Sequence, residues 1–319
     1  MNLEKVVEKI MESNSIAITF HVSPDGDSLG SATALMLALK SLNKNVQVLC
    51  KEEIPNAFSY LKIAEEINIE EYKPQENIDL VIVLDCGDKK RINAELDFEN
   101  RKYSIINIDH HMSNEMYGDI NYVSVESAAV GEIVFNIIRM LKIHITENMG
   151  AGIYTSLLTD TGSFRHSNTT KVTHEIAGYL IENGLNFSEI HRKIFDNKEF
   201  NRVKLYGKVI EKMEMQCENN AVFMYLNKTD LESLGIEQSD TSDLLVFGTK
   251  IKGADVTALI KEADNGVKVS LRSKEKVDVR KIAEGFNGGG HVRAAGFYYE
   301  STMEEIKEKL IAILEKELM

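Results

Sequence analysis

Residues 21–31 read HVSPDGDSLGS and carry one histidine and two aspartates, His21, Asp25 and Asp27. An apolar run rich in β-branched residues precedes this segment, and a stretch with helical spacing follows it. A strand, a polar turn and a helix in this order begin an α/β unit, and open α/β sheets bind ligands at the carboxyl ends of their strands. Taken alone, the segment is equally consistent with an Asp-Gly turn that caps a helix.

The first half of the chain alternates between strand and helix patterns. Apolar, β-branched runs predict strands at residues 16–20, 46–49, 80–84 and 104–108. Helical spacing lies between these runs and is clearest over residues 29–42. Because such alternation is typical of a mainly parallel sheet covered by helices, we predict an α/β fold class.

The second half changes character after residue 128, where the spacing becomes mostly helical. Beyond a long charged helical stretch, strand patterns and a final helix predict a smaller α+β domain, with elements at residues 221–226, 254–260, 267–271 and 302–318. The predicted organisation is a first domain of residues 1–187, a helical connector of residues 188–215 and a second domain of residues 216–319.

Acidic and imidazole side chains also follow two later strands. Asp85 follows the third predicted strand, and Asp109, His110 and His111 follow the fourth. Asp160 stands where a helical run breaks into a Thr-Gly loop. Because the carboxyl ends of parallel strands meet at one edge, these groups would repel one another and resist burial unless cations neutralised them. The sequence therefore predicts a metal site.

The ligand types indicate which metal such a site would hold. Carboxylate-rich sites with a few imidazoles suit hard or borderline octahedral ions, whereas structural zinc sites favour cysteine and histidine. The three cysteines, Cys50, Cys86 and Cys217, are scattered and are predicted to be core residues. At least six candidate ligands suffice for two ions bridged by a shared carboxylate. We predict two divalent ions, with Mn²⁺ preferred and Mg²⁺ or Co²⁺ as alternatives.

In this arrangement of residues the sequence resembles the DHH phosphoesterase superfamily. The residues that match its motifs are His21, Asp25, Asp27, Asp85, Asp109, His110, His111 and Asp160. The segment GGGH at residues 288–291, followed by VRAAGF, resembles the signature of the associated DHHA1 domain. The resemblance covers nearly the whole chain, and it implies a DHH domain, a DHHA1 domain and the hydrolysis of phosphate esters.

The resemblance also implies a role for each motif residue. The ligand sets that it implies are His21, Asp25 and Asp85 for one ion and Asp27, Asp85, His110 and Asp160 for the other. Asp85 would then bridge the two ions. His111 would contact the phosphate or protonate the leaving group, and Asp109 would orient a histidine, as residues behind metal ligands commonly do.

A substrate-binding group is predicted mainly in the second domain. Its members are Gly288, Gly289, Gly290, His291, Arg272 and, after the histidine pair of the first domain, Asn114. The glycines let an anion approach the backbone closely, and His291 and Arg272 can supply hydrogen bonds or charge. Asn114 is included because its position resembles the nano-RNase branch of the superfamily. Without the metal motifs, the glycines would be read as an ordinary flexible turn.

Charge and hydropathy restrict the partners and the location. A formal net charge of −13 argues against binding long duplex nucleic acid, which requires many cationic contacts. Short RNA or a mononucleotide bisphosphate is the predicted partner, and a homodimer is left open. The longest apolar runs are strand-sized and the N-terminal MNLEKVVEKI lacks the apolar block of a signal peptide, so we expect a cytoplasmic protein with no membrane partner.

Within the superfamily, a short two-domain chain resembles the bifunctional oligoribonucleases and 3′-phosphoadenosine-5′-phosphate phosphatases. The resemblance implies manganese-dependent hydrolysis of short oligoribonucleotides and of 3′-phosphoadenosine-5′-phosphate. The first alternative is a stand-alone phosphodiesterase for cyclic di-AMP or its linear product. Manganese pyrophosphatases share the metal motifs but lack the GGGH segment. A non-catalytic nucleotide-binding regulator is the alternative from another class, although every expected ligand position is occupied.

Overall fold

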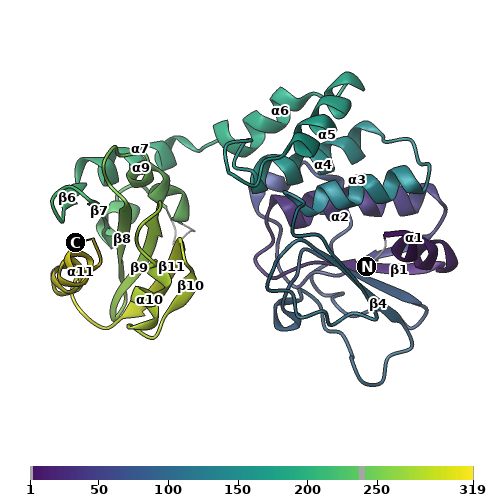
Figure 1. Ribbon diagram of the computed structural model, residues 1–319, viewed down its shortest axis with the longest axis horizontal. Helices are drawn as coiled ribbons and strands as arrows, with labels where there is room; N and C mark the ends of the chain where they lie inside the picture. Colours follow the sequence, from purple (N-terminus) through teal and green to yellow (C-terminus); the bar gives the residue numbers. More distant parts are fainter. Residues whose placement is uncertain (1–2, 237–240, 319) are drawn as a thin grey trace. The chain divides into compact units, whose positions relative to one another are not determined.

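The structure, a computed structural model, describes residues 3–236 and 241–318. The chain divides into two compact units, residues 1–197 and residues 198–319, and each unit has its own sheet and hydrophobic core (Figure 1). Within the described ranges no helix combines the length and the apolar character that crossing a membrane requires.

The first unit is built on a five-stranded sheet in the order β2-β1-β3-β4-β5, in which all neighbouring strands are parallel. Its strands are β1 (Ser15–Thr19), β2 (Asn45–Val48), β3 (Leu80–Leu84), β4 (Ser104–Asp109) and β5 (Ile120–Val123). Every residue of β1 and β3 is buried, which explains their uninterrupted apolar runs. The predicted α/β class with a mainly parallel sheet is confirmed. Strand β5 was not predicted, because it has four residues, of which one is buried.

Helices share one core with one face of this sheet (Figure 1). They are α1 (Leu3–Glu12), α2 (Gly26–Ser41), α3 (Val130–Met140), α4 (Glu147–Asp160), α5 (Lys171–Glu182) and α6 (Phe187–His191). On the opposite face, Val81 and Ile105 pack against the irregular segment after β3, including Ile92 and Phe98. The sheet is therefore covered by helices on one side and by chain without long helices on the other.

Helices α2 and α4 approach each other closely through two glycines. A Cβ atom on Gly30 would lie 2.3 Å from the carbonyl oxygen of Gly152, and one on Gly152 would lie 2.5 Å from the carbonyl oxygen of Gly30. Real side chains do not tolerate such distances to backbone, so both positions require glycine. This contact fixes the N-terminal end of α2, which carries Asp27, against α4, which ends at Asp160.

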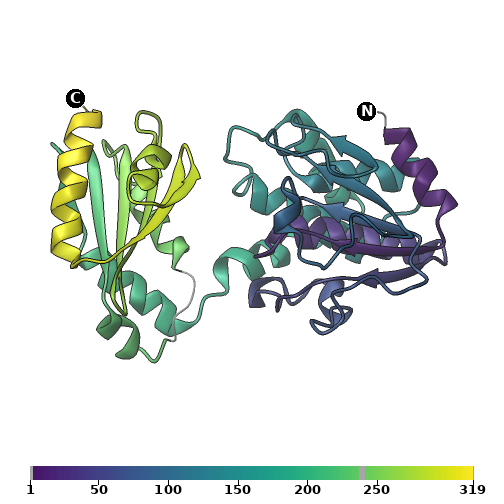
Figure 2. The same cartoon turned by 90° about the horizontal axis from the view of Figure 1, so that it is seen from below.

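The second unit contains a mixed six-stranded sheet in the order β10-β11-β9-β8-β7-β6, in which only the β7–β8 pair is parallel. The strands are β6 (Glu214–Gln216), β7 (Ala221–Leu226), β8 (Val256–Ala263), β9 (Gly266–Ser273), β10 (Gly289–His291) and β11 (Ala294–Tyr299). The helices are α7 (Phe200–Glu211), α8 (Lys228–Glu232), α9 (Leu245–Thr249), α10 (Val279–Glu284) and α11 (Met303–Leu318). Figure 2 shows α11, in yellow, along one face of the sheet. The predicted smaller α+β domain is confirmed.

The segment predicted as a connector, residues 188–215, is divided between the units. It contains the end of α6, a π-helical turn (Arg192–Asp196) and all of α7, and the units separate after Asn197. Helix α7 packs on the second sheet through Leu205 and Val209. The glycine segment is also more ordered than an isolated turn, because residues 289–291 form the edge strand β10, paired with β11.

Candidate metal centre

Three strands and two helices of the first unit bring predicted ligands to one edge of its sheet. His21 follows β1, Asp85 follows β3, and His110 follows β4, while Asp27 and Asp160 lie at the adjoining ends of α2 and α4. The chain brings them together because the carboxyl ends of parallel strands share an edge. His21, Asp27 and Asp85 are buried there, and Asp160 and His110 are partly buried.

One group of ligand atoms consists of His21, Asp25 and Asp85. The His21 Nε2 atom lies 3.3 Å from Asp85 Oδ2 and 3.6 Å from Asp25 Oδ1. Its Nδ1 atom lies 2.8 Å from the carbonyl oxygen of Val22, which can only accept a hydrogen bond. The Nδ1 atom therefore carries the proton, and Nε2 is directed to the carboxylates.

A second group consists of Asp27, His110 and Asp160. The His110 Nε2 atom lies 3.6 Å from both Asp27 Oδ2 and Asp160 Oδ2, and 3.7 Å from Asp85 Oδ1. The two oxygens of Asp85 thus face different groups, one toward His21 and the other toward His110. This is the placement that a ligand shared by two ions requires.

His111 lies beside these groups and is held by Asp109. The Asp109 Oδ1 atom accepts hydrogen bonds from His111 Nδ1 at 2.7 Å and from the His110 backbone at 2.8 Å. Asn114 donates to Asp109 Oδ2 at 2.5 Å and to the side chain of Asn107 at 2.7 Å. The side-chain oxygen of Asn114, Oδ1, accepts a hydrogen bond from the Met116 backbone N–H. The Asn114 side chain, predicted to bind substrate, is therefore occupied within the protein, where it holds Asp109 in place.

The pKa values of the carboxylates at this edge of the sheet indicate whether the residues are suited to bind cations. Burial, followed by repulsion from Asp85 and Asp160, raises the pKa of Asp27 well above its usual range. Burial also raises the pKa of Asp85 and raises the pKa of Asp160 to about 6. The buried Oδ1 atom of Asp85 has no hydrogen-bond partner among the described residues. Carboxylates that are costly to ionise and incompletely hydrogen-bonded are a donor set suited to divalent ions.

The substrate residues predicted in the second unit share one face of its sheet. Arg272 of β9 pairs with Ala294 of β11, which pairs with His291 of β10. Directly paired residues project to the same face, so Arg272 and His291 flank a small alanine. Gly290 has φ +143°, and a Cβ there would lie 2.5 Å from the carbonyl oxygen of Ala294. Glycine is required at this position by both conformation and space.

Both units match known sequence families. Residues 15–162 match the DHH family, N-terminal domain, and residues 207–318 match the DHHA1 domain. The bifunctional oligoribonuclease and PAP phosphatase NrnA of Thermus thermophilus is 30% identical, in an alignment that covers 97% of this chain and 94% of that protein. This chain belongs to the DHH family. It is accordingly a hydrolytic enzyme of the phosphoesterase type.

One further relative and two solved structures extend the likeness. The NrnA protein of Bacillus subtilis is 29% identical over 92% of this chain and 91% of that protein. The crystal structure of an exopolyphosphatase-related protein from Bacteroides fragilis covers 98% of this chain and 95% of its own, with a TM-score of 0.89 and 27% identity. RecJ of Thermus thermophilus, solved in complex with Mn²⁺, shares the fold at a TM-score of 0.53 and 14% identity, over 98% of this chain and 54% of RecJ.

The protonation state of His21, at this edge of the first sheet, leads to a prediction about metal binding. Although burial favours neutral imidazole, hydrogen bonds with Asp25 and Asp85 raise the pKa of His21 from 6.5 to about 10. The metal-free protein therefore carries a protonated His21 at pH 7, whereas a metal ligand must be deprotonated. Mn²⁺ binding should release at least one proton, measured by calorimetry at pH 7 in buffers of different ionisation enthalpy. A binding heat independent of the buffer would contradict this.

The pKa shifts of Asp160 and His21 determine whether the metal-free protein becomes more or less stable as the pH rises. Because the folded-state pKa of Asp160 is raised, its contribution to metal-free stability declines as pH rises from 3.8 to about 6. Protonated His21 contributes to the stability of the metal-free protein. This contribution is complete below pH 6.5 and is lost as the pH rises through about 10. The metal-free protein should therefore become less stable from pH 7 to pH 10, while its affinity for Mn²⁺ increases.

Sequence reasoning missed the groups that hold Asp27. Its carboxylate accepts hydrogen bonds from the backbone of Val130 and Gly131 and from the hydroxyl of Ser156. Ser156 stands four residues before Asp160 on α4, and residues at this spacing share a helix face. This spacing was the only indication in the sequence that Ser156 lies near the candidate site. A serine within an apolar helix is otherwise indistinguishable from an ordinary buried residue.

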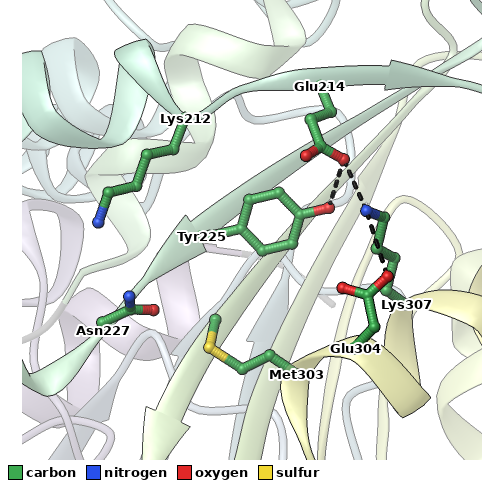
Figure 3. A pocket seen from close by; sticks show the side chains of 7 residues that line it. All are labelled: Lys212, Glu214, Tyr225, Asn227, Met303, Glu304 and Lys307. Carbon is green, nitrogen blue, oxygen red and sulfur yellow. Dashed lines mark hydrogen bonds and ion pairs between the residues drawn. The ribbon is translucent and has the colours of Figure 1, made fainter.

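A pocket of about 360 Å³ lies elsewhere in the second unit, beside α11. In Figure 3 Glu214 faces both Tyr225 and Lys307, at 3.0 and 2.8 Å, and Lys307 also faces Glu304. Lys212, at its rim, pairs with Asp230. Since its charges are neutralised within the protein, this pocket provides no unpaired charged group for a phosphate ester, and the sheet edge of the first unit remains the candidate site.

Proposed function

We propose that this DHH-family chain is a manganese-dependent phosphoesterase that hydrolyses short oligoribonucleotides and 3′-phosphoadenosine-5′-phosphate. The observation that carries the proposal is the position of Asp85, whose two carboxylate oxygens face the two ligand groups separately. The names of the relatives from Thermus thermophilus and Bacillus subtilis support the choice of substrates. The net charge of −13 supports short substrates over long ones.

The proposed ligands divide along the two groups. His21, Asp25 and Asp85 hold one ion, and the other ion is held by Asp27, Asp85, His110 and Asp160. The oxygen-rich donor set with one imidazole in each group favours Mn²⁺, with Mg²⁺ or Co²⁺ as substitutes. When bound, two such ions supply an activated water and stabilise the leaving oxygen.

His111 is proposed as the proton donor to the leaving group. The hydrogen bond with Asp109 raises the pKa of His111 and so favours its protonated form at neutral pH. Since Nδ1 is bound to Asp109, the Nε2 proton is the one available to substrate. The side chain is 45% exposed, which allows a phosphate ester to reach it. Asn114 supports this arrangement through its hydrogen bond to Asp109.

In the second unit, Arg272 and His291 are proposed to bind a phosphate group. Both side chains project from the same face, and the small Ala294 between them leaves room for an anion. Gly289 and Gly290 belong to the adjoining edge strand β10 and Gly288 directly precedes it, so that a chain without side chains there permits close approach to the backbone. Charge-assisted hydrogen bonds from arginine suit a phosphate group.

The decisive experiment compares substrates under one manganese and salt condition. RNAs of about two to five nucleotides should have a higher kcat/KM than RNAs of about twenty, because extra phosphates gain few cationic contacts on an acidic protein. 3′-Phosphoadenosine-5′-phosphate should also be hydrolysed. Equal efficiency on long unstructured RNA would count against the proposal. Faster turnover of cyclic di-AMP or its linear product would favour the phosphodiesterase alternative, and binding without turnover would indicate a regulator.

A further inference from the structure

Asp27 is enclosed more completely than its proposed role as a metal ligand requires. It is 1% exposed and receives hydrogen bonds at both carboxylate oxygens. The Oδ2 atom accepts from the Val130 backbone at 2.9 Å, and Oδ1 accepts from the Gly131 backbone at 3.3 Å. Both donors belong to the first turn of α3, where backbone N–H groups have no partner within the helix.

The shortest of these contacts comes from Ser156 of α4. Its hydroxyl donates to Asp27 Oδ1 at 2.6 Å, and the Ser156 hydroxyl oxygen itself accepts a hydrogen bond from the Gly131 backbone at 2.9 Å. A backbone N–H can only donate, and a carboxylate can only accept. The hydroxyl proton of Ser156 is therefore directed at Asp27, and its orientation is determined by the two neighbours.

Ser156 differs in this respect from the other serine and threonine residues of α2 and α4. Thr155 and Thr159 donate to carbonyl oxygens of α4, at 2.7 and 3.0 Å, and Ser31 donates to a carbonyl of α2 at 3.2 Å. Donation to the preceding helical turn is the usual local bond of such residues. Ser156, fully buried, instead bridges to a residue 129 positions earlier in the chain.

We propose that Ser156 is a positioning residue that fixes the carboxylate of Asp27 for the cation held with His110 and Asp160. By engaging Oδ1, it leaves Oδ2 facing His110 Nε2, 3.6 Å away, at the side where the ligand atoms of this group gather. The inference rests on the proposed two-metal function and assigns to it a residue outside the metal-binding motifs. Hydrogen bonds behind a metal ligand typically contribute 10- to 100-fold to metal affinity.

The test is calorimetric titration of the metal-free protein with Mn²⁺. Ser156→Ala should weaken the binding of one ion by about 10- to 100-fold and leave the other near its wild-type affinity. Ser31→Ala is the matched control, because it removes the same hydroxyl from an equally buried helical position where that hydroxyl donates to the Ser28 carbonyl oxygen and not to a proposed ligand. It should bind both ions as the wild type does.

Two further variants separate positioning from a general structural role. Ser156→Cys fills the same position with a weaker donor, so it should give an intermediate affinity if the alanine variant folds poorly. In an Asp27→Asn background, Ser156→Ala should cause no further loss of Mn²⁺ affinity, because the hydroxyl acts through that carboxylate. Chelator-treated Ser156→Ala and Ser31→Ala proteins should have similar melting temperatures. The increase in melting temperature that Mn²⁺ causes should be smaller than in the wild type only for Ser156→Ala.

The outcomes distinguish the inference from the function on which it rests. If the wild type binds two ions and Ser156→Ala binds both equally well, the positioning role is wrong while the two-metal proposal stands. Equal losses in Ser156→Ala and Ser31→Ala would also overturn it, since any buried hydroxyl would then have the same effect. If the wild type binds fewer than two ions, the proposed function fails and the inference fails with it.

Discussion

Replacing Asp85 by asparagine is expected to remove both metal ions and nearly all activity while the fold survives. A bound ion contributes several kcal/mol of transition-state stabilisation. Since each 1.36 kcal/mol is a factor of ten in rate, kcat/KM should fall by about 10³-fold or more. Asparagine is the sharper substitution because Asp85 has φ +52°, a left-handed conformation that asparagine accepts better than alanine. Metal content, by elemental analysis, and turnover of a dinucleotide are the measurements.

The control for Asp85→Asn is Asp79→Asn, just before β3 and so at the opposite end of the same strand. The Asp79 carboxylate accepts a hydrogen bond from the Asn14 backbone at 2.9 Å and lies away from the ligand groups. Its replacement should leave activity and metal content near the wild type. A folded Asp85→Asn protein with two ions and near-normal turnover would refute the bridging assignment.

Replacing Gly30 by alanine is expected to have the largest effect on stability. In an ordinary helix this change is favourable by about 0.5–1 kcal/mol. Here the new Cβ would lie 2.3 Å from the Gly152 carbonyl oxygen and 2.9 Å from the Ser156 backbone nitrogen, so α2 and α4 would have to separate. Overpacking of this kind costs about 1–3 kcal/mol and occasionally more, and we expect about 3 kcal/mol because backbone cannot yield as a side chain can.

Urea unfolding of chelated protein measures the effect of Gly30→Ala. The midpoint should fall with little change in the slope, because the loss is in native packing. Gly178→Ala is the matched control: it is also a helical glycine, but a Cβ there would meet nothing within 4 Å. It should be neutral or stabilising by about 0.5–1 kcal/mol. If Gly30→Ala were as stable as Gly178→Ala, the close contact between α2 and α4 would be wrong.

Much of the first unit could be predicted because its signals are local. The strand runs at residues 80–84 and 104–108 are continuous and apolar, as buried parallel strands must be, and they were placed within one residue. Strands β5, β6, β10 and β11 were not identified. Ile120–Val123 has one buried position, Glu214–Gln216 and Gly289–His291 have none, and Ala294–Tyr299 has two. Short edge strands owe their pairing to neighbours, which a local pattern does not reveal.

The sequence by itself determined which residues gather at the candidate metal centre, since His21, Asp85 and His110 each follow a strand whose end must lie at the same edge. Only the tertiary structure decided how they are arranged. It placed Asp85 between two ligand groups, turned Asn114 toward Asp109, and brought Ser156 onto Asp27. The physical reason is range: strand and helix periodicity is set by neighbours a few residues apart. A hydrogen bond between residues 129 positions apart depends instead on the packing of whole helices, here through the two glycines of α2 and α4.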